Sequence, residues 1–499
     1  MKRTSIATCP SWPISSATGL KPSCNAKSFA RGGNDPRCDA PRLTNQNGTA
    51  GKGRAGGIKP MRDHATYDAA ADVGVSSGES RKRLRTIVGG SIGHFIEWYE
   101  WSVYGLLAGV FANQMFPASD ETASLIASFS VFAIGFFGRP VGALVLSPLA
   151  DKYGRRTILS ATIIMAGIGS LIIALCPTYA QIGIAAPIII VAARLLQGFS
   201  SGGEFQIAVT FLNEHASDRN RALAASPQMV SIGAAVLAAT AVAGITTRYL
   251  PPDALASWGW RMPFLLGAVL SLYGLYIRYG IEETPAFERI RDQQKSKLTA
   301  ILRSIADYPR EAFIVFIVQM NGVQYYLWLI FLPTYAHLAG GLDRAAGFAG
   351  NVAATAAYCV CVPIFAYMSD RLGRKPFLIA AASCFLLFTY PLLSFLVGTV
   401  NFATFLIVAV IGAVFISLNN AVIGTLFAEL FPTRVRASGM GIPYAVCAAI
   451  FGGTAPLVAT WLHGLGGALY VALYVMAISA ITLLTHLLLT PETRGRPLD

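Results

Sequence analysis

The chain has 499 residues, of which 54% are hydrophobic and only 13% are charged. That charged fraction is about half the usual value for a soluble domain, and it excludes an ordinary soluble fold, which would expose too much of this apolar content. The net charge of +13 does not indicate a nucleic-acid partner either. Beyond residue 80, the Lys and Arg residues concentrate in loops on one side of the predicted membrane spans.

The first segment, residues 1–80, is rich in Gly, Ser, Asn, Pro and Ala and has no apolar periodicity. This composition predicts a disordered N-terminal tail. The tail lacks the apolar core of a signal peptide, so we expect the first membrane helix to direct insertion. The eight cysteines of the chain show no CxxC pair and no metal-ligand spacing, which predicts free thiols and no metal site.

Apolar segments long enough to cross a bilayer follow in two sets of six. They cover residues 86–112, 123–147, 157–176, 182–212, 222–247 and 262–281, and then 311–338, 345–368, 376–396, 402–428, 437–463 and 468–490. They predict an all-α membrane protein with twelve transmembrane helices in two six-helix bundles, residues 81–281 and 311–490. Residues 282–310 are predicted to be a cytoplasmic linker and residues 491–499 a cytoplasmic tail. An even number of spans places both termini in the cytoplasm.

A short charged loop follows the second span and returns after the eighth, 219 residues later (151 to 370). Its shared positions are Asp151, Gly154, Arg155 and Arg156 in the first copy and Asp370, Gly373, Arg374 and Lys375 in the second. The glycine permits a tight turn, and the acid is expected to dock at a neighbouring helix N-terminus. One copy alone would be a plain cytoplasmic hairpin. Two copies indicate a duplicated chain and predict a gating element.

A second charged motif follows spans four and ten, 215 residues apart (214 to 429). Its members are Glu214, Arg219 and Arg221 in the first half and Glu429, Arg434 and Arg436 in the second. Each copy alone again reads as a charged hairpin. As a pair, the motifs mark equivalent positions, and we expect them to form ion pairs with the Asp151 and Asp370 loops and to take part in gating.

Span one carries three ionisable residues, His94, Glu97 and Glu100. His94, Glu97 and Tyr104 lie on one helix face, with Glu100 to one side. A charge at the centre of a span costs about 2.5 kcal/mol or more, so such groups usually face a cavity. Two carboxylates and a histidine this close are expected to titrate together, which is typical of a proton carrier. The alternative is that Glu97 or Glu100 forms a structural pair near the interface.

Two arginines lie within apolar spans, Arg139 in span two and Arg194 in span four. Arginine binds carboxylates with two hydrogen bonds, so both are candidate anchors for an organic anion. Gln197 and Glu204 share the helix face of Arg194, the first as a candidate substrate ligand and the second as a candidate proton-coupling residue. The alternative for Arg194 is a structural ion pair.

The second half contributes Tyr325 in span seven and Asn419 in span ten as further candidate substrate ligands. A polar amide inside a span needs a hydrogen-bond partner and can line a cavity. Aromatic residues such as Tyr325 more often serve packing or the membrane interface.

Taken together, these motifs resemble the major facilitator superfamily and, within it, the metabolite:proton symporters, especially the bacterial 2-oxoglutarate permeases. The segments that carry the resemblance are the two Asp-x-x-Gly-Arg-Arg/Lys loops and residues 93–100, 139–142, 194–204, 258–264, 283–287, 429–436 and 491–496. The sequence departs from the family pattern at His94, where Asn is usual, and at Glu100, where Asp is usual. It departs again at residues 324–328 of span seven.

No Walker loop, metal-ligand cluster or nucleophile–base set is present in the sequence, which predicts that the protein is not an enzyme and needs no cofactor. The resemblance implies a monomeric secondary transporter in the lipid bilayer of the bacterial inner membrane. It would import a small organic acid, such as a 2-oxoglutarate-like dicarboxylate, with protons by alternating access. Two alternatives are a proton symporter for a zwitterionic osmolyte such as proline or betaine, and a membrane sensor that does not translocate.

Overall fold

A computed structural model describes residues 77–279 and 306–498, apart from seven positions inside these ranges. Those positions are Gly154, Gly203, His215, Ser217, Asp218, Arg434 and Pro497. Most of the predicted tail 1–80 and of the predicted linker 282–310 therefore lies outside the described residues. Helix α1 begins at Ser77, inside the segment predicted to be disordered. That boundary was placed too late, because the charged residues before the first apolar run continue its helix.

The described part of the N-terminal half consists of helices and turns without a strand. Its helices are α1 (Ser77–Met115), α2 (Glu121–Tyr153), α3 (Arg155–Leu175), α4 (Tyr179–Ile182), α5 (Ala185–Ser200), α6 (Glu204–Glu214), α7 (Arg221–Tyr249), α8 (Pro252–Ser257), the 3-10 helix η1 (Gly259–Arg261) and α9 (Met262–Tyr279).

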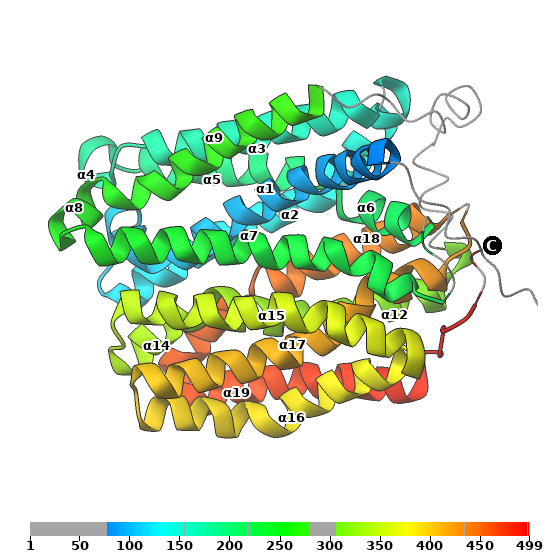
Figure 1. Cartoon of the computed structure of the whole chain (residues 1–499). Helices are drawn as coiled ribbons and strands as arrows, with labels where there is room; N and C mark the ends of the chain where they lie inside the picture. Colours follow the sequence, from blue (N-terminus) through cyan, green and yellow to red (C-terminus); the bar gives the residue numbers. More distant parts are fainter. Residues whose placement is uncertain are drawn as a thin grey trace, which may run out of the picture. The chain divides into compact units, whose positions relative to one another are not determined.

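The described part of the C-terminal half repeats this all-helical pattern (Figure 1). Its helices are α12 (Pro309–Gln319), α13 (Gly322–Tyr326), the π-helix η2 (Leu327–Phe331), α14 (Leu332–Gly340), α15 (Arg344–Leu372), α16 (Lys375–Gly398), α17 (Phe402–Leu430), α18 (Arg436–Cys447), the π-helix η3 (Ala448–Gly452) and α19 (Ala455–Leu488).

Within the described ranges, nine helical segments are long and apolar enough to cross a membrane, fewer than the twelve spans predicted. Three features account for the difference. Helix α1 is interrupted by polar residues, α5 is shorter than a membrane span, and one of the nine segments, Arg436–Leu488, runs over a break at Gly466 and Gly467. The twelve-span count stays a prediction.

Span four, predicted as one helix over residues 182–212, is divided in the structure. Helix α5 ends at Ser200, and α6 begins at Glu204. The intervening Gly202 lies so close to α2 that a Cβ atom there would overlap the backbone nitrogen of Ala143. Glycine is also a poor helix former. The break therefore follows from the Gly-Gly pair that the sequence places there.

Span seven, predicted as one helix over residues 311–338, is divided as well. Helix α12 ends at Gln319, a short break leads into α13, and the π-helix η2 follows. The side chain of Asn351 on α15 donates a hydrogen bond of 2.9 Å to the backbone oxygen of Leu329 in η2. Irregular helices of this kind are common at functional sites.

Helices α2 and α5 pack at very close range through glycines. A Cβ atom on Gly198 of α5 would overlap the backbone oxygen of Gly135 on α2, and one on Gly142 would overlap the backbone oxygen of Phe199. Small residues permit such close contact, which provides van der Waals packing where no hydrophobic effect drives helices together. This contact holds the two helices that carry Arg139 and Arg194.

The two halves meet along pairs of helices. Helix α7 of the first half lies beside α15 of the second (Figure 1), and α2 packs against α18, η3 and α19. Through these contacts α2 lies against α18, and Trp98 on α1 lies against Tyr325 and Tyr326 of α13.

We expect Gly198→Ala to lower the thermal unfolding temperature of the purified protein. The new methyl group meets backbone atoms that cannot rotate away, and overpacking of this kind costs about 1–3 kcal/mol. The matched control is Gly464→Ala on α19, where a Cβ atom meets nothing within 4 Å. It should leave the unfolding temperature unchanged or raise it, because alanine favours a helix. Equal unfolding temperatures for the two variants would show that the α2–α5 contact tolerates a side chain.

Candidate functional site

A buried ion pair joins the first two spans at the boundary between the halves. Arg139 on α2 places Nη2 3.4 Å from Oε1 of Glu97 on α1. His94, one turn before Glu97, places Nδ1 4.0 Å from Glu97 Oε2. All three side chains are buried. The carboxylate that neutralises Arg139 thus comes from another helix.

The guanidinium of Arg139 also lies against aromatic rings. Its Cζ is 4.4 Å from the ring centroid of Trp101 and 4.5 Å from that of Phe136. Cation–π contacts of this kind stabilise a guanidinium that has left water. The Nε atom of Arg139 is buried and has no hydrogen-bond partner among the described residues. The group therefore keeps a donor that an anion can use.

Arg194 on α5 lies on the same tryptophan. Its Cζ is 4.0 Å from the Trp101 ring centroid and 4.5 Å from that of Tyr104. Its Nη1 donates a hydrogen bond of 2.8 Å to Gln197 Oε1. The Nε and Nη2 atoms of Arg194 are buried without a hydrogen-bond partner among the described residues. Two guanidinium groups with unused donors therefore share one indole ring.

Glu100 has partners of its own, different from those of Glu97. It accepts hydrogen bonds from Ser271 Oγ on α9, at 3.0 Å, and from Gln197 Nε2 on α5, at 3.4 Å. These contacts hold it inside the first half, away from the boundary where Glu97 lies. The sequence predicted one cluster of His94, Glu97 and Glu100, but in the structure Glu97 pairs with Arg139 while Glu100 is hydrogen-bonded to Ser271 and Gln197.

A group of aromatic rings from both halves lies beside the Glu97–Arg139 pair. Trp98 on α1 lies with its ring centroid 5.5 Å from that of Tyr325 and stacks on Tyr326 at 6.1 Å. Phe205 on α6 stacks on Tyr444 of α18 at 4.3 Å. We call these five residues the aromatic wall. Tyr325 was predicted from the sequence as a ligand, and Tyr326 stands beside it in the same aromatic run. Tyr444 and Phe205 were not predicted, because isolated aromatic residues in a span usually only pack.

The remaining predicted ligands are spread more widely. Tyr104 donates a hydrogen bond to the backbone oxygen of Ser128 while its ring faces Arg194. Asn419 lies inside the second half, where Asn321 Nδ2 donates to its Oδ1 at 3.1 Å. It lines a cavity of about 10 Å³ together with Gln324 and Asn420, which is about enough for one water molecule. The side chain of Glu204 lies outside the described part.

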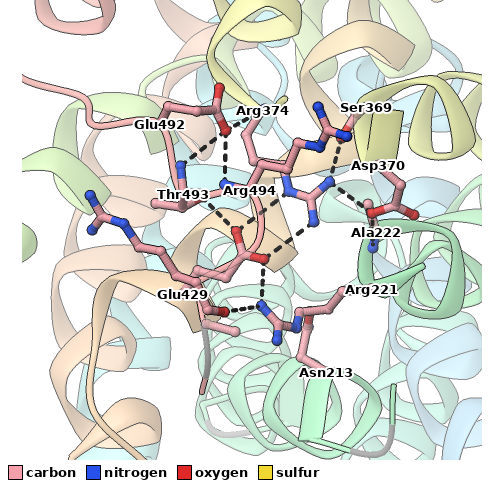
Figure 2. Close-up of polar contacts among 12 residues, drawn as sticks. Asn213, Arg221, Ala222, Ser369, Asp370, Arg374, Glu429, Glu492, Thr493 and Arg494 are labelled. Carbon is pink, nitrogen blue, oxygen red and sulfur yellow. Dashed lines mark hydrogen bonds and ion pairs between the residues drawn. The ribbon is translucent and has the colours of Figure 1, made fainter. Parts of the chain in front are cut away.

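A second set of charges joins the halves at the face that carries the C-terminal residues (Figure 2). Glu429 Oε1 lies 2.8 Å from Arg221 Nη1 of the first half and 3.2 Å from Arg374 Nη2 of the second. Thr493 of the tail donates its hydroxyl hydrogen to Glu429 Oε2. We call this the Glu429 network. Burial opposes the charge on Arg374, but Glu429 and Asp370 outweigh it and raise the pKa of Arg374.

Asp370 joins the Glu429 network to the first turn of α7. Its two carboxylate oxygens accept hydrogen bonds from the backbone N–H groups of Ala222 and Leu223, each at 3.0 Å. Arg374 Nη1 donates to Asp370 Oδ1 at 2.8 Å. An anion at a helix N-terminus is stabilised by the helix dipole. The docking predicted for the first loop copy is thus observed for the second, across the two halves.

The predicted ion pairing between the two repeated motifs is confirmed for the second copy by Glu429 and Arg374. Most of the remaining motif residues lie outside the described part of the chain. They are Gly154 and Arg434, together with the side chains of Asp151, Arg155, Arg156 and Glu214. Their gating role stays a prediction.

Glu492 caps the start of α16, a role the sequence did not reveal. Its carboxylate accepts hydrogen bonds from the backbone N–H groups of Arg374, at 2.9 Å, and Lys375, at 3.1 Å. Gly373 has φ +103°, and a Cβ atom there would meet the Glu492 carboxylate. Burial opposes the charge of Glu492, but four backbone N–H groups outweigh it and lower its pKa below the ordinary 4.5. The only sequence signal was the charged motif at residues 491–496.

Comparison with known proteins agrees with this arrangement. Residues 86–311 match the family model for the sugar (and other) transporters, and residues 344–499 match that of the major facilitator superfamily. An alpha-ketoglutarate permease of Escherichia coli (strain K12) is 32% identical over 434 residues, which cover 86% of this chain and 99% of that protein. The chain belongs to the major facilitator superfamily.

Other members of the superfamily are similar to this chain over most of its length. A putative proline/betaine transporter of Staphylococcus aureus (strain COL) is 33% identical over 84% of this chain and 91% of that protein. A crystal structure of a D-xylose-proton symporter shares the fold, with a TM-score of 0.65 and 18% identity over 83% of this chain and 100% of that one. The major facilitator fold and a multi-pass membrane transporter, which is not an enzyme, are therefore confirmed.

No group of three or more His, Cys, Asp or Glu side chains in the described part of this transporter is placed to hold a metal ion.

The lowered pKa of Glu492 gives a pH-dependent prediction. A carboxylate whose pKa falls on folding stabilises the folded state above its unfolded pKa, and that stabilisation is lost as the pH falls through the folded value. Glu492→Gln should therefore lower the thermal unfolding temperature at pH 7. The difference in unfolding temperature between the variant and the parent should become smaller below pH 4.5. Asp253→Asn, at an exposed carboxylate of α8, is the control. A difference that stays constant with pH would rule out the ionised cap.

Proposed function

We propose that this protein is a proton-coupled importer of a small organic acid, such as a 2-oxoglutarate-like dicarboxylate, and that it works by alternating access. The observation that carries the proposal is the pair of buried guanidinium groups on one tryptophan ring. Arg139 and Arg194 keep unused hydrogen-bond donors, and a carboxylate is the group that a guanidinium binds with two parallel hydrogen bonds.

Proton coupling follows from the partner of Arg139. Glu97 occupies Arg139 while it is ionised, so it competes with a substrate carboxylate for the same guanidinium. A proton on Glu97 removes its charge and leaves Arg139 to the substrate. Glu100, held by Ser271 and Gln197 next to Arg194, is the second proton-coupling candidate, with His94 beside Glu97.

We propose that the Glu429 network is the gate on the cytoplasmic face and that the bacterial inner membrane is the site of action, with both termini inside. The network joins Arg221 of the first half to Glu429 and Arg374 of the second, so the two halves must separate there before a substrate passes. Each chain contains both halves of the site, which supports a monomer as the working unit.

A second candidate function is uptake of a zwitterionic osmolyte such as proline or betaine. The aromatic wall supports it, because aromatic faces bind quaternary ammonium groups through cation–π contacts. Relatives named as putative proline/betaine transporters support it as well. The two arginines favour the organic acid, since a zwitterion uses only one of them for its single carboxylate.

The test is an uptake screen with the full chain in proteoliposomes under an inward pH gradient. We expect accumulation of labelled 2-oxoglutarate that unlabelled dicarboxylates reduce and betaine does not. Accumulation of betaine alone would establish the second candidate, and saturable binding without uptake of any solute would indicate a sensor.

Arg139→Lys tests the substrate site. Lysine keeps the charge but loses the planar fork, and a hydrogen bond to a charged group contributes about 1.5–3 kcal/mol. We therefore expect at least tenfold weaker calorimetric binding of 2-oxoglutarate by Arg139→Lys, and no detectable binding by Arg139→Ala. Arg248→Lys, at an exposed arginine in the last turn of α7, should bind as the parent does. Parent-like affinity in folded Arg139→Ala would make Arg139 a structural residue.

A further inference from the structure

The buried charges of the transporter form two separate groups. Outside the Glu429 network and its neighbours Asp370 and Arg436, the charged side chains that are buried among the described residues are two carboxylates and two guanidiniums, with His94 and His486 as the only buried histidines. The four are Glu97, Glu100, Arg139 and Arg194. We call them the charged core. With both carboxylates ionised, its formal charge is zero.

The other ionisable groups around Glu97 and Glu100 are one histidine and three tyrosines, which carry no charge in their neutral forms. They are His94 and Tyr99 on α1, Tyr326 on α13 and Tyr444 on α18. The groups on α5 and α9 that hold Glu100 are the neutral Gln197 and Ser271. Glu204 begins α6, and its side chain lies outside the described ones.

A protein that closes around its substrate inside hydrocarbon needs a charged core whose net charge is zero. A net charge in a low-dielectric interior is costly, whereas a balanced set of ion pairs is tolerated. The empty core is balanced without protons. A dianion adds two negative charges, and the core has two carboxylates that can each take up one proton.

We propose that the carrier crosses between its two states only with a balanced core, so that each negative charge on the substrate enters with one proton. This inference rests on the proposed function and sets its stoichiometry. A dicarboxylate dianion enters with two protons, one on Glu97 and one on Glu100, and the cycle moves no net charge. A zwitterion leaves the core balanced by itself and enters without a proton.

The experiment separates the pH gradient from the membrane potential in proteoliposomes that contain the full chain. Labelled 2-oxoglutarate is the probe, and a potassium gradient with valinomycin sets the potential. We expect a pH gradient, alkaline inside, to drive accumulation and a potential of either sign to change it less than twofold. One uncompensated charge would change the equilibrium accumulation about 50-fold per 100 mV, and a dependence of that size in the parent would overturn the inference.

Two variants test the assignment of the protons. Glu97→Gln and Glu100→Gln each remove one proton acceptor. The loaded core then balances with the dianion and one proton, but the empty core keeps one positive charge and cannot balance. Each variant should therefore exchange external for internal 2-oxoglutarate while net uptake falls, and the net uptake that remains should fall when the inside is negative and rise when it is positive, by about 50-fold per 100 mV at equilibrium. A merely structural role would lower exchange and net uptake together without creating this dependence, and net uptake by either variant that does not depend on the potential would overturn the inference.

Two further carboxylates complete the design. Glu121→Gln removes a partly exposed carboxylate that pairs with Arg344 outside the core. Uptake by this control should not depend on the membrane potential. Uptake by Glu204→Gln should not depend on the potential either, because the proposal assigns the two protons to Glu97 and Glu100. A potential-dependent Glu204 variant would overturn the assignment of two core carboxylates.

The inference and the proposed function fail in different ways. If betaine enters and 2-oxoglutarate does not, the proposed function is wrong, and the rule that the core must be balanced then requires that betaine only equilibrates and that neither gradient drives its uptake. Betaine uptake driven by the pH gradient would overturn the rule. If neither solute is transported, calorimetry of 2-oxoglutarate binding in buffers of different ionisation enthalpy counts the protons taken up. Two protons per dianion supports the rule, and none overturns it.

Discussion

The need to pair every buried charge governs this structure. In hydrocarbon an unpaired charge is costly, and the described residues meet this constraint at two levels. Glu97 and Arg139 pair between α1 and α2 at the boundary of the halves. At the face of the C-terminal residues, Glu429 pairs with Arg221 and Arg374. Both levels hold segments together that lie far apart in the sequence.

The Glu429 network and the charged core differ in which groups satisfy their charges. In the Glu429 network each acid has several donors, including backbone N–H groups and the tail residue Thr493. In the charged core, Arg139 and Arg194 keep donors without a partner among the described residues and lie against aromatic rings instead. The network satisfies its charges within the protein, whereas the core keeps hydrogen-bond donors that no described residue uses.

Sequence reasoning found the charged members of the site because ionisable residues stand out in an apolar span. It did not find Tyr444 or the capping role of Glu492. Aromatic residues are frequent in membrane helices for packing alone, so their position in a wall depends on helix contacts. Glu492 caps α16 only because the tail folds back to Arg374 and Lys375, and no local pattern encodes that distance.

The sequence by itself determined the class of the protein, the duplication and most of the helical segments, because hydrophobic length and charge placement are local properties. Only the tertiary structure decided which charges meet. Glu97 and Glu100 are three residues apart, yet one faces Arg139 and the other faces Ser271 and Gln197. That choice depends on which helix packs on each side of α1. The break in span seven was decided there too, whereas the glycines at the break in span four were already visible in the sequence.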